Sequence, residues 1–414
     1  MPDEIADIGN LSRRNILKTV GAAGLTLGGI AGATSIQAQD TGMEEQLSTL
    51  DGQDRFNVEY ADERGAERAK AVAEEVIYDI DPLNTVTIEA SPEGLQELSE
   101  ADPIEFIEAD PRYRTGLPPQ EIRVHDPDGQ IVPWGVDRIG APVAHEKGIR
   151  GETSHVAVIN TGIDSTHEDL SASVGEGVAF TPCQGDCDAP WDDDHGHGTH
   201  VAGTIGALDN QLGVLGVAPE TTLHAAKVLN QNGIGFASDV ALGILWTAVQ
   251  GYDVANMSLG GPFSPLVQAA VEFASEQGVL LISSAGNEAG PVSYPASADE
   301  VLAVSATTSD DELAWFSNFG PEIELAAPGV DVLSTFPNDN YGVLSGTSMA
   351  SPHVSGTGAL LMALGFTAGE ARTFMMETAE DIGLPPEEQG AGLVNAAAVA
   401  THLKNKQEKS KTTH

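Results

Sequence analysis

The sequence predicts an α/β protein with a doubly wound, mostly parallel sheet, preceded by a small α+β unit of ferredoxin-like organisation. Two patterns support this fold class. From residue 129 onward, apolar runs of strand length alternate with longer helical segments, and repeated β-α-β units of this kind build parallel sheets. Between residues 54 and 115, shorter and more charged elements follow a βαββαβ-like order. The 414 residues suffice for both units.

Residues 1–38 have the pattern of an export signal. Arg13 and Arg14 precede an apolar, Gly/Ala-rich stretch at 20–36, and Ala38 follows it as a small residue suited to cleavage. Paired arginines before a weakly hydrophobic stretch are typical of twin-arginine signals. A membrane anchor is the alternative, but the stretch is short for a spanning helix and contains five glycines. We therefore expect an extracellular protein without a stable membrane anchor.

Residues 54–115 form the predicted small unit. A strand, a charged amphipathic helix, a second strand, a second helix and a last strand are expected in that order. They are expected at 55–60, 61–76, 84–89, 93–100 and 104–108. Residues 116–128, which are rich in Gly, Pro and Asp, are expected to form a linker.

Residues 129–403 form the predicted large domain, and residues 404–414 a polar tail. Strands are expected at 155–159, 223–229, 254–257, 279–284 and 301–306. Helices are expected at 238–249, at 265–277 and after Thr347. Functional sites of a doubly wound sheet lie beyond the carboxyl ends of its strands, so the residues that follow these strands are the ones to inspect.

The chain is strongly acidic. Asp and Glu number 62 against 19 Lys plus Arg, which gives a formal charge of -43 (19 minus 62). Because concentrated salt screens the repulsion among such charges, we interpret the acidity as an adaptation to high salt. An acidic surface for solubility or for cationic partners is the alternative. Nucleic acid is not an expected partner, since phosphate contacts need Lys and Arg.

The two cysteines, Cys183 and Cys187, exclude a disulfide-rich scaffold. A local disulfide in a surface loop and two free thiols both remain open. A zinc site is not expected, because no second Cys or His pair completes a tetrahedral ligand set.

Three Gly-rich segments carry the chemistry. V-A-V-I-N-T-G-I-D at 156–164 is a buried strand that ends in a turn, D-D-H-G-H-G-T-H-V-A-G-T at 193–204 is a turn that opens a helix, and S-G-T-S-M-A-S-P-H-V-S-G at 345–356 places Ser348 at a helix start. A serine at a helix N-terminus is a candidate nucleophile, because backbone N–H groups there favour developing negative charge. A histidine on a neighbouring turn can serve as its base.

Together these segments resemble the subtilisin-like serine proteases, in that family's order of acid, base and nucleophile. The resemblance covers residues 130–396, including G-A-G-L-V-N-A at 390–396. It implies hydrolysis of protein or peptide substrates. The acidic composition and the paired arginines are similar to those of exported proteases of halophilic archaea.

The resemblance implies a role for individual residues. Ser348 would be the nucleophile, His197 the general base and Asn287 the side-chain donor of the oxyanion hole. A substrate-binding edge that pairs with the peptide main chain would be formed by Ser258, Leu259, Gly260 and Gly261. His200 and His353 lie in the same motifs, but packing is the expected role of each.

One position departs from the family pattern, in which the first strand ends in Asp-Thr-Gly or Asp-Ser-Gly. Here it ends in Asn160-Thr161-Gly162. An amide has nearly the shape of a carboxylate but no charge to stabilise the imidazolium, and its NH₂ group can hold the wrong tautomer of the histidine. Loss of this acid lowers kcat by roughly 10⁴ in such triads. We therefore expect reduced catalysis; the nearby Asp164, Asp192, Asp193 and Asp194 are the acids that would have to substitute.

The resemblance also implies a structural Ca²⁺ ion. The loop A-L-D-N-Q-L-G-V-L-G-V-A-P at 207–219 matches the family's calcium loop without gaps, and hard oxygen ligands are available in it. The implied ligand residues are Gln130, Asp169, Leu208, Asn210, Leu212 and Val214. An ordinary surface loop is the alternative. Gln130 as a ligand places the start of the mature chain near Gly129.

Two functions fit the sequence. The first is a secreted serine endopeptidase, weakened at Asn160 and made with residues 54–115 as an inhibitor-type pro-domain that is a partner of its own cleft. The second is a catalytically degenerate relative that binds peptides. Intact Ser348, His197 and Asn287 favour the enzyme.

Overall fold

The computed structural model describes residues 54–118, 123–125 and 127–401. Contacts divide the chain into two compact units with the boundary between Pro111 and Arg112. The predicted export signal at 1–38 and the polar tail at 404–414 lie outside the described residues. Among the described helices, none combines the length and the apolar composition that crossing a membrane requires.

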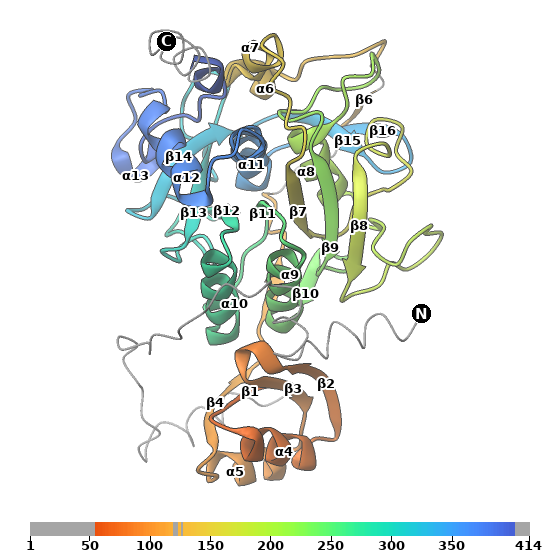
Figure 1. Cartoon of the computed structure of the whole chain (residues 1–414), viewed down its shortest axis with the longest axis vertical. Helices are drawn as coiled ribbons and strands as arrows, with labels where there is room; N and C mark the ends of the chain where they lie inside the picture. The colour runs from red at the N-terminus through yellow and green to blue at the C-terminus, as the bar shows by residue number, and fades with distance from the viewer. Residues whose placement is uncertain (1–53, 119–122, 126, 402–414) are drawn as a thin grey trace, which may run out of the picture. The chain divides into compact units, whose positions relative to one another are not determined.

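The small unit is an antiparallel sheet covered by two helices (Figure 1). Its elements follow the order βαββαβ and its strands the order β2-β3-β1-β4, which confirms the ferredoxin-like prediction. Apolar side chains from the first and third strands and from both helices share one core. The elements are β1 (Arg55–Tyr60), α4 (Glu63–Val72), β2 (Glu75–Ile80), β3 (Thr85–Glu89), α5 (Pro92–Ser99) and β4 (Ile104–Ala109), with a 3₁₀ turn at Asp81–Leu83.

The helix expected at 61–76 is wrong at its end. It stops at Val72, because Ala73 has an extended backbone (φ −63°, ψ 134°). Strand β2, which the sequence prediction missed, follows at once and pairs with β3. Its Tyr78 and Ile80 are buried, so β2 carries the period-two pattern of a strand with one covered face.

The large unit is built around a seven-stranded sheet of order β14-β13-β12-β11-β7-β9-β8. Every neighbouring pair in it is parallel, which confirms the predicted fold class. Its strands are β7 (His155–Asn160), β8 (Val174–Ala179), β9 (Thr222–Lys227), β11 (Val254–Met257), β12 (Leu280–Ser284), β13 (Val301–Thr307) and β14 (Ile323–Pro328). Strands β11 and β12 are buried along their whole length, and β7 is buried except at its first residue, as expected when helices cover both faces.

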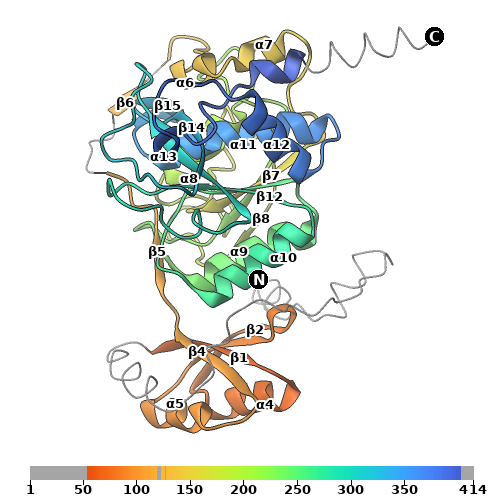
Figure 2. The same ribbon diagram turned by 90° about the vertical axis from the view of Figure 1, so that its left-hand side faces the viewer.

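Helices lie on both faces of this sheet (Figures 1 and 2). On one face α9 (Ala237–Gln250) packs beside α10 (Pro265–Glu276), and on the other α8 (His197–Gly206) packs beside α11 (Thr347–Ala363). Shorter elements complete the unit: β5 (Arg112–Arg114), β6 (Arg123–His125), α6 (Trp134–Arg138), α7 (Ala141–His145), β10 (Ile234–Phe236), β15 (Val332–Phe336), β16 (Asn340–Leu344), α12 (Ala368–Thr378) and α13 (Pro386–Gln389).

The linker expected at 116–128 contains regular structure. Strand β6 pairs with β16 in antiparallel register, and the segment just before the linker, β5, pairs with β10. Gly and Pro in this stretch mark turns, but they do not prevent short strands between the turns from finding a sheet edge. Residues 112–114 and 123–125 are therefore held to the large unit through these pairings.

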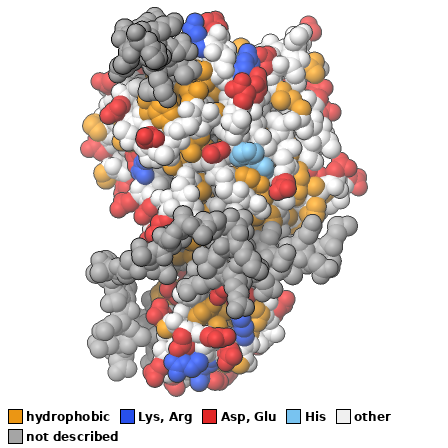
Figure 3. All heavy atoms as spheres, viewed as in Figure 1, with side chains coloured by type: hydrophobic (Ala, Val, Ile, Leu, Met, Phe, Trp, Pro, Cys, Tyr) orange, Lys and Arg blue, Asp and Glu red, His pale blue; other side chains and the backbone are white. Residues whose placement is uncertain are grey.

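The surface is as acidic as the composition predicts. In Figure 3, Asp and Glu side chains are spread over the visible face of the large unit and Lys and Arg are few. Five basic residues in the described part of the large unit form ion pairs: Arg123 with Asp331, Arg138 with Asp311 and Glu380, Arg150 with Asp209, Lys227 with Asp194, and Arg372 with Glu324. Lys227 differs from the four arginines because its side chain is fully buried.

Candidate active site

The expected base lies between the end of one strand and the start of one helix. Asn160 is the last residue of β7 and His197 the first of α8, and both are buried. His197 Nδ1 lies 2.8 Å from Asn160 Oδ1. Its other ring nitrogen, Nε2, is buried and has no hydrogen-bond partner. Nε2 is therefore the atom left to act on a neighbouring hydroxyl.

The orientation of the Asn160 amide follows from its other contacts. The Thr161 N–H donates to Oδ1 at 2.8 Å, and Nδ2 donates to the Ser258 carbonyl at 3.3 Å. A backbone N–H can only donate and a carbonyl can only accept, so these contacts distinguish the two ends of the amide. The oxygen faces His197, which makes Nδ1–H the donor and leaves Nε2 as the acceptor. This is the tautomer that a general base requires.

The geometry thus separates two effects of Asn160, its effect on the His197 tautomer and its lack of a negative charge. The tautomer is favourable, but the charge is missing. Burial lowers the pKa of His197 well below 6.5, and His195 and His200 lower it further. With no carboxylate beside it, the imidazolium that would form during attack lacks a counter-charge.

None of the four nearby acids contacts the His197 ring. Asp164 accepts from Thr166 and Asn338, and Asp192 from Ser165 and the loop amides of residues 188 and 189. Asp193 holds the amides at the start of α8, and Asp194 pairs with Lys227. Each carboxylate is already committed to holding a turn or a cation.

The two other motif histidines make structural contacts. His200 Nε2 lies 3.0 Å from the Val332 carbonyl, and His353 Nδ1 lies 2.9 Å from the Met349 carbonyl. Burial lowers the pKa of each to about 4, so both are neutral near pH 7. These contacts agree with a packing role.

Ser348 is the second residue of α11 and is buried. In the first helical turn, the Thr347 N–H donates to Asn287 Oδ1 and the Met349 N–H to the Gly346 carbonyl. The Ser348 N–H between them has no acceptor within the helix, so it is the backbone donor suited to a developing oxyanion. Four residues later, Pro352 supplies no N–H for the Ser348 carbonyl. The Ser258 hydroxyl donates to that carbonyl instead, at 3.0 Å. Ser258 therefore joins the edge after β11 to the start of α11.

The Asn287 amide is oriented as the expected oxyanion donor. Its Oδ1 accepts from the Thr347 backbone N–H at 2.8 Å and from the Thr347 hydroxyl at 3.1 Å. Its Nδ2 consequently points the other way and donates to the Gly116 carbonyl at 3.1 Å. Thr347, which sequence reasoning did not single out, fixes the direction of this donor.

A cleft of about 500 Å³ is lined by Asn287 and the Gly260–Gly261 edge together with a segment of the chain itself, residues 112–116. Strand β5 lies between two edges, antiparallel to β10 on one side and bridged through Arg114 to Gly260 on the other. The Arg114 and Gly260 backbones exchange two hydrogen bonds of 3.0 Å. This is how an extended peptide adds a strand to an exposed edge.

The segment also fills a side-chain pocket. Tyr113 is fully buried, and its hydroxyl donates to the Pro262 carbonyl at 2.8 Å. A Cβ on Gly261 would lie 2.7 Å from the Tyr113 ring, so the glycine is needed for the ring to fit. Two residues along, the Thr115 carbonyl lies 3.5 Å from Ser348 Oγ, next to the Gly116 carbonyl that Asn287 holds.

The predicted edge Ser258, Leu259, Gly260 and Gly261 thus meets a peptide, and Ser348 and Asn287 meet the same stretch of its backbone. Sequence reasoning expected residues 54–115 to be a partner of the cleft but did not single out residues 112–116 as the segment that contacts it. The position of these residues between the two units is the signal that was available.

The six predicted calcium residues lie in one loop region. Gln130 Nε2 donates to the Leu208 carbonyl at 2.6 Å, and the Val214 N–H donates to Asp169 Oδ2 at 2.8 Å. The Leu212 N–H donates to the Asn210 side chain at 2.9 Å. Asp169 Oδ1 is buried without a hydrogen-bond partner, and burial raises the pKa of Asp169 to about 7. A buried carboxylate oxygen in this state fits a hard cation.

The two cysteines, for which the sequence left a disulfide and free thiols open, form a disulfide. Cys183 and Cys187 are bridged, with their Cα atoms 6.4 Å apart. The bridge closes a short loop that precedes the His197 turn.

Comparisons with known proteins agree with this geometry. Residues 151–395 match the family model described as the subtilase family. The chain is 41% identical to an alkaline protease of Alkalihalobacillus alcalophilus over 78% of this chain and 81% of that protein. It is 44% identical to subtilisin Savinase of Lederbergia lenta, over 65% of this chain and 98% of the relative. The chain therefore belongs to the subtilase family and is a subtilisin-type serine endopeptidase.

Proposed function

We propose that this protein is an exported serine endopeptidase that cleaves peptide bonds with Ser348 and His197, at a rate reduced by Asn160. The observation that carries the proposal is the peptide segment 112–116 in the cleft, with the Gly116 carbonyl oxygen on Asn287 and Ser348 beside it. A substrate that binds in this register has two adjacent backbone carbonyls held beside the nucleophile and the oxyanion donor, as Thr115 and Gly116 are here.

The chemistry follows from the groups present. As the Ser348 hydroxyl attacks the carbonyl carbon, its proton passes to His197 Nε2, and the oxyanion is stabilised by Asn287 Nδ2 and the Ser348 N–H. His197 then protonates the leaving amine, and water repeats the sequence on the acyl-enzyme. Asn160 accepts from Nδ1–H throughout but supplies no negative charge, so each state that contains an imidazolium is destabilised.

Fluorophosphonate labelling with peptide hydrolysis, in molar salt with Ca²⁺, tests this proposal. Wild type should label and hydrolyse slowly, and Ser348→Ala should do neither. A wild-type protein that binds peptides with no labelling and no turnover would favour the alternative, a peptide-binding protein. The neutral partner of His197 is the observation on which that alternative rests.

The pro-domain assignment extends the proposal. Residues 54–111 are joined directly to the segment in the cleft, which supports an inhibitor-type pro-domain that is a partner of the active site. The Asn287 contact to the Gly116 carbonyl supports Gly116–Leu117 as the bond that would be cleaved. This is earlier than the start near Gly129 that the sequence suggests. N-terminal sequencing of the secreted protein tests it, and slow release is expected with Asn160 in place.

A structural Ca²⁺ ion at Gln130, Asp169, Leu208, Asn210, Leu212 and Val214 is part of the proposal. The cation would compensate the unpartnered Asp169 oxygen, and binding to the folded state alone raises stability by mass action. Chelation should therefore lower the Tm of wild type. Asp169→Asn should lose most of this response to chelator; a response equal to that of wild type would contradict the assignment.

Export by the twin-arginine route and adaptation to high salt remain proposals that rest on residues 1–38 and on the net charge of -43. Replacement of Arg13 and Arg14 by lysine should retain the protein inside the cell. Activity and Tm should rise together with salt concentration, since screening relieves repulsion among acidic side chains.

A further inference from the structure

We propose that Lys227 is a positioning residue of this active site: paired with Asp194, its ammonium holds the Thr161 peptide and through it the Asn160–His197 pair. This inference rests on the proposed peptidase activity, to which it adds a residue outside the motif set.

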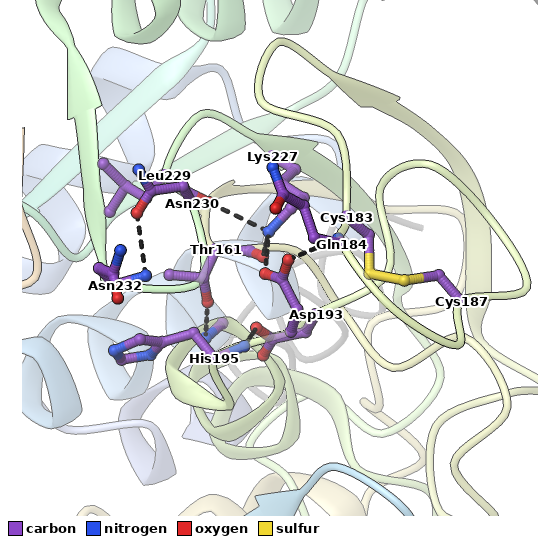
Figure 4. Close-up of polar contacts among 12 residues, drawn as sticks. Thr161, Cys183, Gln184, Cys187, Asp193, His195, Lys227, Leu229, Asn230 and Asn232 are labelled. Carbon is purple, nitrogen blue, oxygen red and sulfur yellow. Dashed lines mark hydrogen bonds and ion pairs between the residues drawn. A yellow bond between two sulfur atoms is a disulfide. The ribbon is translucent and has the colours of Figure 1, made fainter.

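Lys227 is an unusual residue for its position. It is the last residue of β9, lies in register with Asn160 across the sheet, and is fully buried. Its three N–H groups have three partners: the Thr161 carbonyl at 2.6 Å, Asp194 Oδ1 at 2.6 Å and the Leu229 carbonyl at 3.1 Å. Figure 4 shows the side chain of Lys227 between Thr161 and Leu229. All its donors are thus used to hold backbone and one carboxylate.

Thr161 connects the ammonium to both members of the catalytic pair. Its carbonyl accepts from Lys227, and its N–H donates to Asn160 Oδ1, which is the contact that directs the amide oxygen toward His197. Its hydroxyl accepts from the N–H of Gly198, the residue after His197, at 2.9 Å. A shift of this one residue would disturb the Asn160 amide and the start of α8 together.

Asp194 fixes the ammonium from the opposite side. One carboxylate oxygen accepts from Lys227, and the other accepts from the Gln184 N–H at 2.8 Å. Gln184 lies inside the loop closed by Cys183 and Cys187, as Figure 4 shows. The cation therefore has a charged partner that is itself tied to a cross-linked loop, which limits the movement of the whole set.

The competing explanation is that the Lys227–Asp194 ion pair only stabilises the fold. Variants that remove one charge or both charges of the pair distinguish this explanation from a positioning role. Lys227→Met leaves Asp194 as a buried carboxylate without its partner, which destabilises the fold strongly. The double variant Lys227→Met/Asp194→Asn removes that unpaired charge. It should recover most of the lost Tm, yet the Thr161 carbonyl still lacks its donor.

The experiment measures Tm, kcat and KM for both variants in the full chain, in the wild-type and Asn160→Asp backgrounds. We expect the double variant to keep a kcat about tenfold to hundredfold below its parent, the loss typical of misplaced catalytic groups, with KM changed much less. Arg372→Met, which breaks an ion pair away from the site, should leave kcat unchanged. If kcat recovers together with Tm in the double variant, Lys227 is only structural and the proposal is overturned.

One readout requires no turnover. ¹⁵N chemical shifts of His197, assigned by comparison with His197→Gln, report its tautomer directly. We expect Nδ1–H in wild type and a mixture in the double variant; an unchanged tautomer with unchanged kcat would refute the positioning role. An inactive, unlabelled wild type and Asn160→Asp variant would instead refute the proposed peptidase function, so the two failures are distinguishable.

Discussion

Two asparagines take part in the proposed active site, and neighbouring donors orient their amide groups in opposite directions. At Asn287 the Thr347 N–H and hydroxyl bind the amide oxygen, so the NH₂ group faces the cleft. At Asn160 the Thr161 N–H binds the oxygen beside His197, so the NH₂ group faces away, toward the Ser258 carbonyl. In both cases a backbone N–H group sets the direction of the amide. At Asn160 it belongs to the next residue, Thr161, and at Asn287 it belongs to Thr347 at the start of α11.

The difference lies in what each position requires. An oxyanion needs a donor, and a neutral amide donates well in a site shielded from water. An imidazolium needs a counter-charge, which an amide of any orientation lacks. Correct orientation is therefore sufficient for the proposed role of Asn287. At Asn160 it gives the required tautomer of His197 but not the counter-charge.

The largest effect should come from restoring the charge. Asn160→Asp keeps the shape and the Thr161 contact, and it adds the carboxylate that stabilises the imidazolium, so kcat should rise about 10³–10⁴-fold. Peptide hydrolysis under saturating substrate measures this.

Asn160→Ala is the matched control for that variant. It removes the orientation of His197 together with any polarity, so its kcat should fall below that of wild type. Equal rates for wild type and Asn160→Asp would show that the charge at this position hardly matters here.

Loss of the oxyanion donor Asn287 should have the next largest effect on kcat. Asn287→Ala should lower kcat about 10²–10³-fold, or about 3–4 kcal/mol in the activation barrier, with KM nearly constant. The Asn160→Asp background makes the loss measurable. Asn287→Asp should be as poor as Asn287→Ala, because a carboxylate cannot donate to an oxyanion; a rate near the parental one would argue against the oxyanion role.

Local motifs were enough to predict the parts of the site that lie where strands end and helices begin. Strand ends and helix starts placed Asn160, His197 and Ser348 at one edge of the sheet, and the seven-stranded fold agrees with the predicted class. The periodicity of the small unit predicted its other strands and helices, but the predicted helix ran on to residue 76 and β2 (Glu75–Ile80) was missed. A helix end set by one extended residue leaves little trace in the pattern.

The sequence could not predict contacts that join distant segments. The Asn160 amide direction depends on Thr161 and Ser258, the Asn287 direction on Thr347, and the cleft segment on an edge that lies 146 residues further along the chain at Gly260 (260 minus 114). No motif encodes these pairs, because each partner is a common residue type or a backbone group. They become visible only when the strands are brought together.

A variant at Gly261 tests substrate binding separately from the roles of Asn160 and Asn287. A methyl group there would lie 2.7 Å from the Tyr113 ring, so Gly261→Ala should raise KM about tenfold for peptides with Tyr four residues before the cleaved bond. Peptides with Ala at that position are the control and should keep their KM. An equal change for both peptides would mean that Tyr113 does not mark a substrate pocket.

The smallest effect is one of pH rather than of maximal rate, and it tests directly what the missing charge does to the base. Burial lowers the pKa of His197 well below 6.5, and the nearby His195 and His200 lower it further. Activity requires neutral His197, so the rate of wild type should persist as pH falls below 6.5 and be lost only as pH passes through that low pKa. A carboxylate at position 160 favours the charged imidazole and raises its pKa, so the acid limb of kcat/KM in Asn160→Asp should lie at higher pH. Coincident acid limbs would mean that the base does not sense residue 160.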